Sequence, residues 1–578
     1  WHIFPNSEPF PLSSVANDLD TAVREQGPRS SSGWERIAAA ATGIFGTAFG
    51  TLATHNGSVV MGQSLKQIAT GLLHPSRGYA GGYNFFDPDS YFTVQAALLA
   101  GDPLVNQELK GILERSGSKL CKGIPPAQWE EWRRSRRKKR KGSVTTFSKP
   151  PECVKGQVPH HFMKDKEVYS AISGARQTGP NVFWTLAALE YASFTGDVKW
   201  LQGYLPVLRK ALDFLHVDNK TDLVFAPGSL MVDTFVRTGF TADTNAAMLL
   251  LLEQFAKAED VAGDPVKANT LRHTASRISG ALNRELWDED HYVTSIDREG
   301  SVKDHVDYDA NWMAVAFGAA DGPASPHCSG PCETKANRIL ARIDSNPLAT
   351  IVPSWGSEIL YESKDGGTGD SISGMGRFAW FNALARKHIR GPGELEFFKT
   401  RLLGKLMHDL RRTVWMRERY APDGTQQLDR TSHYFEYPSI VSLMVFKVLY
   451  GVSMEYSTVQ IDPWEIEAFH WGIGDFQVRY QRRSFCYVSL PRSGHVSFKL
   501  LGFTSETESS SFSIKTACSP PAKTNQQEDQ RNSQSPDVSF TATSIEGTLE
   551  FSIDFKKDCP SWPWVIVRKI NTDKPSLS

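Results

Sequence analysis

A short pattern recurs along the first 450 residues of this 578-residue chain: an apolar helical segment, then Gly-Asp, then a second helical segment. The dipeptide occurs at 101–102, 196–197 and 263–264. Glycine commonly ends a helix in the left-handed conformation, and aspartate commonly caps the N-terminus of the helix that follows. Each Gly-Asp pair therefore predicts the elbow of a hairpin of two helices.

Apolar residues at helical spacing predict about a dozen helices between residues 30 and 450. The clearest is 242–262, ADTNAAMLLLLEQFAKAEDVA, and a second helical segment follows it at 265–286. Helical hairpins in such a series either close into a ring or stack into an open solenoid, and the two give the same pattern. We expect the ring, an all-α (α/α)6 barrel over residues 1–452, with a basic insertion loop at about 117–165.

The pattern changes after Gly451. Segments such as FQVRYQRRSFCYVSL, HVSFKLLGF and GTLEFSIDF alternate in character or are rich in β-branched and aromatic residues, which is typical of strands. The sequence therefore predicts a C-terminal all-β domain of sandwich-like form over residues 453–578.

Charge and composition exclude some classes of partner. The 64 Lys and Arg residues balance 64 Asp and Glu residues, and the pI is near 7.3. A protein that binds nucleic acid by neutralising phosphates is basic, so this class is not expected. No run of 18 uncharged apolar residues indicates a membrane span. The basic block EWRRSRRKKRKG, at 131–142, is interpreted as a solvated surface insertion rather than a contact for a polyanion.

The cysteines and sequons favour an extracellular protein. Cys121 and Cys153 bracket the basic block, and the tight loop CSGPC at 328–332 holds a second pair of cysteines. Sequons stand at 56–58 and 219–221. We expect two disulfides and a secreted, glycosylated monomer; free cytosolic thiols with chance sequons are the alternative. No metal loop of EF-hand spacing is present, so we expect neither a metal nor another cofactor.

Two aspartates stand on either side of Arg237 in the sequence, and each could have a structural or a catalytic role. Asp243 opens the long helical segment in the position of an N-cap, which indicates a structural role. Asp233 follows the apolar run 230–232 and lies too far upstream to cap that helix. It is therefore a candidate catalytic acid, and Arg237 is a candidate for binding substrate.

A second stretch of acids lies among aromatic residues at 81–94, GGYNFFDPDSYFTV. Asp87 and Asp89 precede a predicted helix and have Tyr83 and Phe86 close by in sequence. Aromatic rings beside carboxylates suit the recognition of sugars, because rings pack on C–H faces and carboxylates bind hydroxyls. The structural alternative is that Asp89 caps the helix.

A third stretch, DRTSHYFEYPSIVSL, leads into the last helix of the predicted barrel. Glu436 stands just before that helix with His433 and Tyr434 upstream, and the structural alternative is a glutamate favoured by the helix dipole. The glycine-rich stretch 354–381 adds further candidates for substrate binding: Trp355, Glu358, Asp370 and Arg377.

Four motifs occur in one order along the chain: DPDSYFTV, VDTFVR, ADTNA and FEYP. Together they resemble segments of the six-hairpin glycosidases, nearest to trehalases, processing α-glucosidases and glucoamylases. The resemblance implies that Asp233 is the general acid, that Glu436 is the general base and that the anomeric configuration is inverted. Pro88 stands where those enzymes have tryptophan, so the resemblance does not name the sugar.

The leading hypothesis is an inverting glycoside hydrolase that acts on the end of an oligosaccharide or polysaccharide. One alternative is a polysaccharide lyase on a similar helical ring, with His433 and Tyr434 abstracting the proton. Another is a carbohydrate-binding protein without activity. The products separate the three, since a lyase gives an unsaturated sugar, a hydrolase gives a reducing sugar and a binder gives nothing.

Overall fold

The computed structural model describes the chain in segments, and every structural statement below refers to these residues. They are residues 83–85, 88–99, 103–123, 153–163, 166–170, 177–228, 230–232, 235, 237–324, 333–352, 354–361, 374–391, 393–413, 419–425, 436–466, 468–473, 476–482, 484–490, 495–501, 511–517, 538–543, 548–554 and 564–569.

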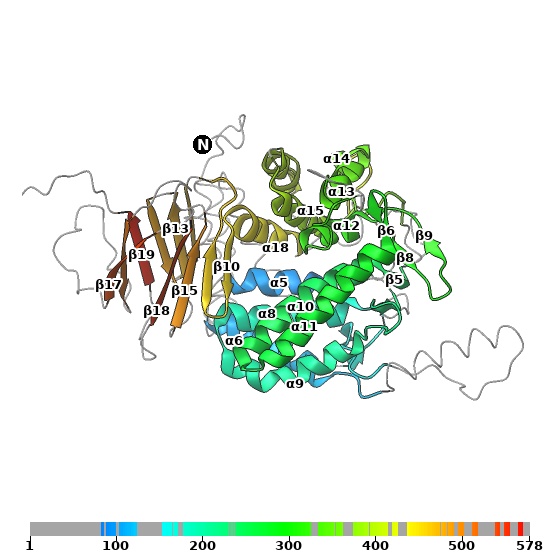
Figure 1. Ribbon diagram of the computed structural model, residues 1–578, viewed down its shortest axis with the longest axis horizontal. Helices are drawn as coiled ribbons and strands as arrows, with labels where there is room; N and C mark the ends of the chain where they lie inside the picture. The colour runs from blue at the N-terminus through cyan, green and yellow to red at the C-terminus, as the bar shows by residue number, and fades with distance from the viewer. Residues whose placement is uncertain are drawn as a thin grey trace, which may run out of the picture.

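Six helices of the described segments form a ring (Figure 1). They are α5 (Pro88–Leu98), α8 (Gly179–Thr195), α10 (Ala242–Ala262), α12 (Tyr308–Ala316), α15 (Gly376–Ile389) and α18 (Glu436–Leu443). Each packs against the next, and α18 packs against α5. The first and last helices of an open solenoid do not meet, so this contact confirms the predicted closed helical barrel for the described residues.

The helices of the ring are buried on almost every side. In α8, 15 of the 17 residues are buried, which is typical of a helix with neighbours all round. Outer helices pack on the ring and bury only one face; α9, for example, buries Trp200, Leu201, Leu205, Leu208 and Ala211. The described outer helices are α6 (Pro103–Ser118), α9 (Val198–Phe214), α11 (Pro265–Ala281), α13 (Lys335–Asp344), α14 (Pro347–Ile351), α16 (Glu394–Phe397) and α17 (Gly404–Thr413).

Short π-helical turns continue some of these helices, and small sheets decorate the connections. The turns are η2 (Leu282–Leu286), η3 (Phe398–Leu403) and η4 (Met444–Leu449). The small sheets have the orders β1-β2-β3, β4-β5-β8-β9 and β6-β7. Their strands are β1 (Tyr83–Phe85), β2 (His161–Met163), β3 (Lys166–Val168), β4 (Phe225–Ala226), β5 (Gly239–Thr241), β6 (Trp287–Asp288), β7 (His291–Tyr292), β8 (Ser295–Ile296) and β9 (Val302–Lys303).

The Gly-Asp elbows are confirmed at two of their three positions. Gly196 ends α8 with φ of 68°, and the carboxylate of Asp197 accepts from the backbone N–H of Trp200. Gly263 ends α10 with φ of 92°, and Asp264 caps α11 in the same way. The pair at 101–102 lies outside the described residues.

Every element that the structure describes after Gly451 is a strand, as the sequence predicts (Figure 1). One sheet has the order β10-β11-β15-β18, and the other has the order β12-β13-β14-β19-β16-β17. All neighbours are antiparallel except β11 and β15. The strands are β10 (Val452–Glu455), β11 (Thr458–Ile461), β12 (Ala468–Ile473), β13 (Phe476–Gln481), β14 (Phe485–Ser489), β15 (His495–Leu500), β16 (Ser511–Ala517), β17 (Val538–Thr543), β18 (Leu549–Asp554) and β19 (Trp564–Lys569).

The predicted disulfide between Cys121 and Cys153 is confirmed, with the two Cα atoms 6.0 Å apart. It joins the end of α6 to the segment that leads into β2. The CSGPC loop lies outside the described residues. None of the helices described is both long enough and apolar enough to cross a membrane.

The helical and β parts meet at a tight junction around Gly451. This residue has φ of 62°, and its carbonyl accepts from the N–H of Asp462 at 3.0 Å. A Cβ atom at position 451 would lie 1.8 Å from the carbonyl oxygen of Asp462. Nearby, Nζ of Lys387 donates to three backbone carbonyls, of which one is that of Asp462 at 3.2 Å. The junction therefore requires both the conformation and the small size of glycine.

Replacing Gly451 with alanine should destabilise the protein strongly, with Gly263→Ala as the matched control. Both positions have positive φ, which costs a side chain about 1–2 kcal/mol. No atom lies within 4 Å of a Cβ at position 263. The free energy of unfolding of G263A should therefore fall by only this backbone cost. G451A should lose at least about 2 kcal/mol more, because the backbone of 451 and 462 must separate. Urea unfolding measures both; equal losses would contradict this description of the junction.

Candidate active site

The inner helices begin at the same end of the ring. Hydroxyls at the starts of α8 and α10, Thr178 and Thr244, bond each other at 2.9 Å. At the opposite end, Lys447 in η4 contacts Gln95 near the end of α5 at 2.8 Å and also Glu190 near the end of α8. The helices therefore run in parallel, and their positive dipole ends gather on one rim, where carboxylates are favoured.

The segment Leu230–Val232 lies across this rim. The N–H of Leu230 donates to Oδ2 of Asp243 in α10 at 3.4 Å, and the carbonyl of Met231 accepts from Nη1 of Arg377 in α15 at 2.6 Å. A Cβ atom on Gly179, the first residue of α8, would lie 2.0 Å from the carbonyl oxygen of Leu230. Three helix starts therefore hold the backbone that leads directly into Asp233.

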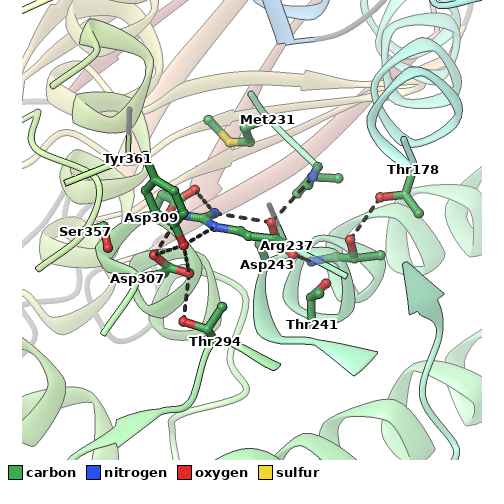
Figure 2. A network of polar contacts seen from close by, with 12 residues as sticks. Thr178, Met231, Arg237, Thr241, Asp243, Thr294, Asp307, Asp309, Ser357 and Tyr361 are labelled. Atoms are coloured by element: carbon green, nitrogen blue, oxygen red, sulfur yellow. Dashed lines mark hydrogen bonds and ion pairs between the residues drawn. The ribbon is translucent and has the colours of Figure 1, made fainter. Parts of the chain in front are cut away.

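Arg237 occupies the centre of a buried cluster of acids, which Figure 2 shows. Its guanidinium forms two parallel bonds with Asp309, Nη1 to Oδ2 at 2.8 Å and Nη2 to Oδ1 at 2.9 Å. Nη2 also lies 2.9 Å from Oδ1 of Asp307, and Nη1 lies 3.3 Å from Oδ2 of Asp243. Only 1% of the Arg237 side chain is exposed, so these carboxylates take up its charge inside the protein.

Asp243 is structural, but not as the cap that the sequence indicated. Thr241 has the N-cap position of α10, and Asp243 lies in the first turn. Its carboxylate bonds the N–H of Leu230 and the guanidinium of Arg237. The cap interpretation is therefore wrong, because a buried cation from the preceding loop competes for the carboxylate.

Two of the carboxylates that share this guanidinium, those of Asp309 and Asp307, have pKa values that diverge. Burial raises the pKa of Asp309 to about 6; the attraction of Arg237 opposes this rise, whereas the charges of Asp307 and Asp243 add to it. Burial alone would also raise the pKa of Asp307, but Arg237 and the contact with His305 lower it to about 2. Asp309 is therefore the acid of this pair that gains a proton first as the pH falls.

A hydrogen-bonded chain leads from Asp307 towards solvent. The Tyr361 hydroxyl donates to Oδ1 of Asp307 at 3.1 Å and is hydrogen-bonded to Nε2 of His305 at 2.8 Å. Nε of Arg237 also donates to this hydroxyl at 3.4 Å. The ring of Tyr361 stacks on Phe235, with centroids 4.0 Å apart. His305, whose side chain is 19% exposed, forms the outer end of the chain.

The structure places the other predicted residues as follows. Arg377 lies in the first turn of α15, buried, with its bond to Met231. Trp355 is buried in the core and pairs with Gly374. Glu358 accepts from the N–H of Val306 and from Arg342, each at 2.8 Å. The backbone alone is described for Tyr83 in β1, Asp89 in α5 and Glu436, the first residue of α18. Asp87, Phe86, Asp233, Asp370, His433 and Tyr434 lie outside the described residues.

The sequence interpretation missed Asp307, Asp309, His305 and Tyr361. The first three stand in HVDYDANWM, where two acids precede and begin helix α12. Asp309 lies in the first turn of α12 just as Asp243 lies in the first turn of α10, one hairpin earlier. Comparing the two helix starts in the sequence could therefore have identified these acids. Nothing in the sequence around Tyr361 indicates its role.

Comparison with known proteins shows distant structural likeness only. No family model and no curated protein matches the chain. The chain is similar to a rhamnosidase of Bacillus sp. GL1 (14% identity, TM-score 0.47), over 75% of this chain and 39% of that one. It is also similar to an α-L-rhamnosidase from Dictyoglumus thermophilum (10%, TM-score 0.40, 88% and 49%) and to a bacterial glucoamylase complexed with acarbose (12%, TM-score 0.42, 68% and 55%).

These structures are glycosidases, the class that the sequence motifs resemble. The chain spans less than half the length of either rhamnosidase. With TM-scores below 0.5, the likenesses are too distant to assign residues or an activity to this chain.

Gly179→Ala should disturb the rim, with Gly203→Ala as the matched control. The new Cβ at 179 would meet the Leu230 carbonyl, so the segment before Asp233 must move. We expect a loss of about 2 kcal/mol or more in the free energy of unfolding. Position 203 lies in α9 with no atom within 4 Å of a Cβ, so G203A should stabilise by about 0.5–1 kcal/mol. Urea titration of both variants is the measurement; an unchanged G179A would show that the contact is absent.

The proton on Asp309 should appear in the pH dependence of stability. Its pKa is about 6 when folded and 3.8 as the ordinary value. Between these values the folded protein binds more protons than the unfolded chain, so this contribution to stability falls as pH rises. The difference in unfolding free energy between wild type and Asp309→Asn should therefore be larger near pH 4 than near pH 7, by on the order of 2–3 kcal/mol. A difference independent of pH would rule out the buried proton.

Proposed function

We propose that this protein is an inverting glycoside hydrolase that acts at the end of an oligosaccharide or polysaccharide, with Asp233 as general acid and Glu436 as general base. One observation supports the proposal: the segment Leu230–Val232, which Asp233 follows in sequence, and the start of α18 both belong to the rim where the inner helices begin. Asp233 directly follows the segment Leu230–Val232, and Glu436 is the first residue of α18. Glycoside hydrolysis by inversion needs two carboxyl groups about 6.5–9.5 Å apart, which residues on one rim of a helical ring can supply.

The surroundings of the chain near Asp233 suit an acid that must hold a proton. Met231 and Val232, just before it, are buried, and an apolar setting raises the pKa of a carboxyl group. A free guanidinium would lower that pKa. The guanidinium of Arg237 is instead bound to Asp309, Asp307 and Asp243. Its charge is therefore largely compensated before it can act on the acid.

The proposed substrate is a carbohydrate, bound by candidates around the same rim. Asp89 lies at the start of α5 and Arg377 at the start of α15, so helix starts again bring them to this end. We further propose that residues 453–578 form a separate sandwich-like domain and that the protein is secreted. The disulfide between Cys121 and Cys153 supports secretion, because such bonds persist in oxidising compartments.

Asp233→Asn should cut turnover by about 10²–10⁴ while leaving the unfolding transition unchanged, because the group is needed for proton transfer and not for packing. The assay measures sugar release from a panel of alkyl glycosides, oligosaccharides and polysaccharides, whose leaving groups need protonation, with the anomer of the product read by NMR. Asp213→Asn, on the exposed face of α9, is the matched control and should keep full turnover.

Three outcomes would overturn the proposal. Near-normal turnover by D233N would exclude Asp233 as the acid. An unsaturated product absorbing in the ultraviolet would identify a lyase. Binding to a glycan without release by the wild type would identify a carbohydrate-binding protein.

A further inference from the structure

The cluster around Arg237 has no part in the proposed chemistry, yet Arg237 follows the proposed acid by only four residues in the sequence. Its guanidinium is bound by carboxylates in the first turns of α10 and α12 and by Asp307, which directly precedes α12. Such a cluster is costly to bury. The question is what the protein gains from it beyond packing.

The chain on both sides of Asp233 is held by specific contacts. Upstream, Leu230 bonds Asp243 and Met231 bonds Arg377. Downstream, Phe235 stacks on Tyr361 and also lies under the guanidinium of Arg237, at 4.8 Å from its centroid. In the sequence, Asp233 lies between these two fixed points, Met231 and Phe235.

Two side chains from elsewhere in the chain control the downstream fixed point. Among the described carboxylates, Asp309 alone forms the pair of parallel bonds that sets the plane of the guanidinium. Tyr361 contacts both downstream residues, since its ring stacks on Phe235 and its hydroxyl accepts from Arg237 Nε. Asp307 contributes less specifically, because its oxygens are shared with Thr294 and Tyr361.

We propose that Asp309 and Tyr361 are positioning residues for the general acid: they hold Arg237 and Phe235, and thereby place the backbone of Asp233 for proton transfer. The inference rests on the proposed function. Proton transfer requires the acid within about 2.6–3.2 Å of the leaving oxygen, and a misplacement of about 1 Å costs on the order of 10²-fold in rate. Neither residue needs to touch the substrate to have this effect.

The test uses Tyr361→Phe and Asp309→Asn in the full chain. Y361F keeps the ring stack on Phe235 and removes only the hydroxyl. It therefore still tests the inference in case D309N fails to fold. Tyr292→Phe and Glu259→Gln are matched controls. The Tyr292 hydroxyl bonds Asn283 and the carbonyl of Ala319, and Glu259 bonds Arg209 towards the other end of α10. Neither control residue contacts Arg237 among the bonds and ion pairs of the described residues.

The first readout is the leaving-group dependence of kcat, on the sugar that the panel identifies. Methanol leaves a methyl glycoside only if a well-placed acid protonates its oxygen, whereas dinitrophenolate leaves a dinitrophenyl glycoside without protonation. Y361F and D309N should lower kcat on the methyl glycoside about 10–100-fold, leave KM unchanged, and change kcat on the dinitrophenyl glycoside by less than about threefold. D233N should show the same pattern with a larger loss.

The second readout is hydrogen exchange of the peptide spanning residues 229–238. Exchange should rise in Y361F and D309N and stay unchanged in Y292F and E259Q. Unchanged exchange in both test variants would overturn the inference, and so would equal losses of kcat on the two glycosides, since a purely structural role predicts equal losses.

The failure of this inference differs from failure of the proposed function. If D233N shows the leaving-group pattern but Y361F and D309N do not, only the positioning role is wrong. If the wild type hydrolyses no glycoside, or D233N keeps its turnover, the proposed function is wrong and the positioning of an acid falls with it.

Discussion

Closure of the helical ring is the constraint on which the rest of this structure depends. The last inner helix, α18, packs against the first, α5, although more than 300 residues separate them. Buried apolar side chains supply most of the energy of such packing. Lys447 adds specificity, because its ammonium contacts Gln95 of α5 and Glu190 of α8 and so fixes how the ring closes. An outer helix returns the chain between successive inner helices, as α9 does between α8 and α10, so the inner helices run in the same direction.

Parallel inner helices create an uneven electrostatic field. Their N-termini share one rim and carry partial positive charge, so acids are stabilised there and polar side chains concentrate. The first turns of α10 and α12 carry Asp243 and Asp309, and Asp307 precedes α12. The rim tolerates these buried carboxylates because helix dipoles and one guanidinium oppose their charge. The same field favours a site where carboxyl groups do chemistry.

The buried cluster costs desolvation free energy, and in return it restricts the loop that carries the proposed acid. The loop from Leu230 to Arg237 is tied at both ends by buried bonds, which costs desolvation but restricts its motion. A loop without such ties would let the proposed acid sample many positions. In the proposed mechanism, holding Arg237 among acids also keeps its positive charge from lowering the pKa of the proposed general acid.

The sequence by itself determined the features that depend on neighbouring residues. The elbows at Gly196 and Gly263 follow from local backbone preference and capping, and the change to strands after Gly451 follows from local side-chain pattern. The disulfide of Cys121 and Cys153 was also predictable, because only 32 residues separate the two. Only the tertiary structure decided between a ring and a solenoid, since both repeat the same hairpin. It also showed that Asp243 is a partner of Arg237 and not a helix cap. The other partners of Arg237, which are Asp307, Asp309 and Tyr361, come from segments about 70–120 residues away. No local sequence pattern encodes which distant charges a closed ring brings together.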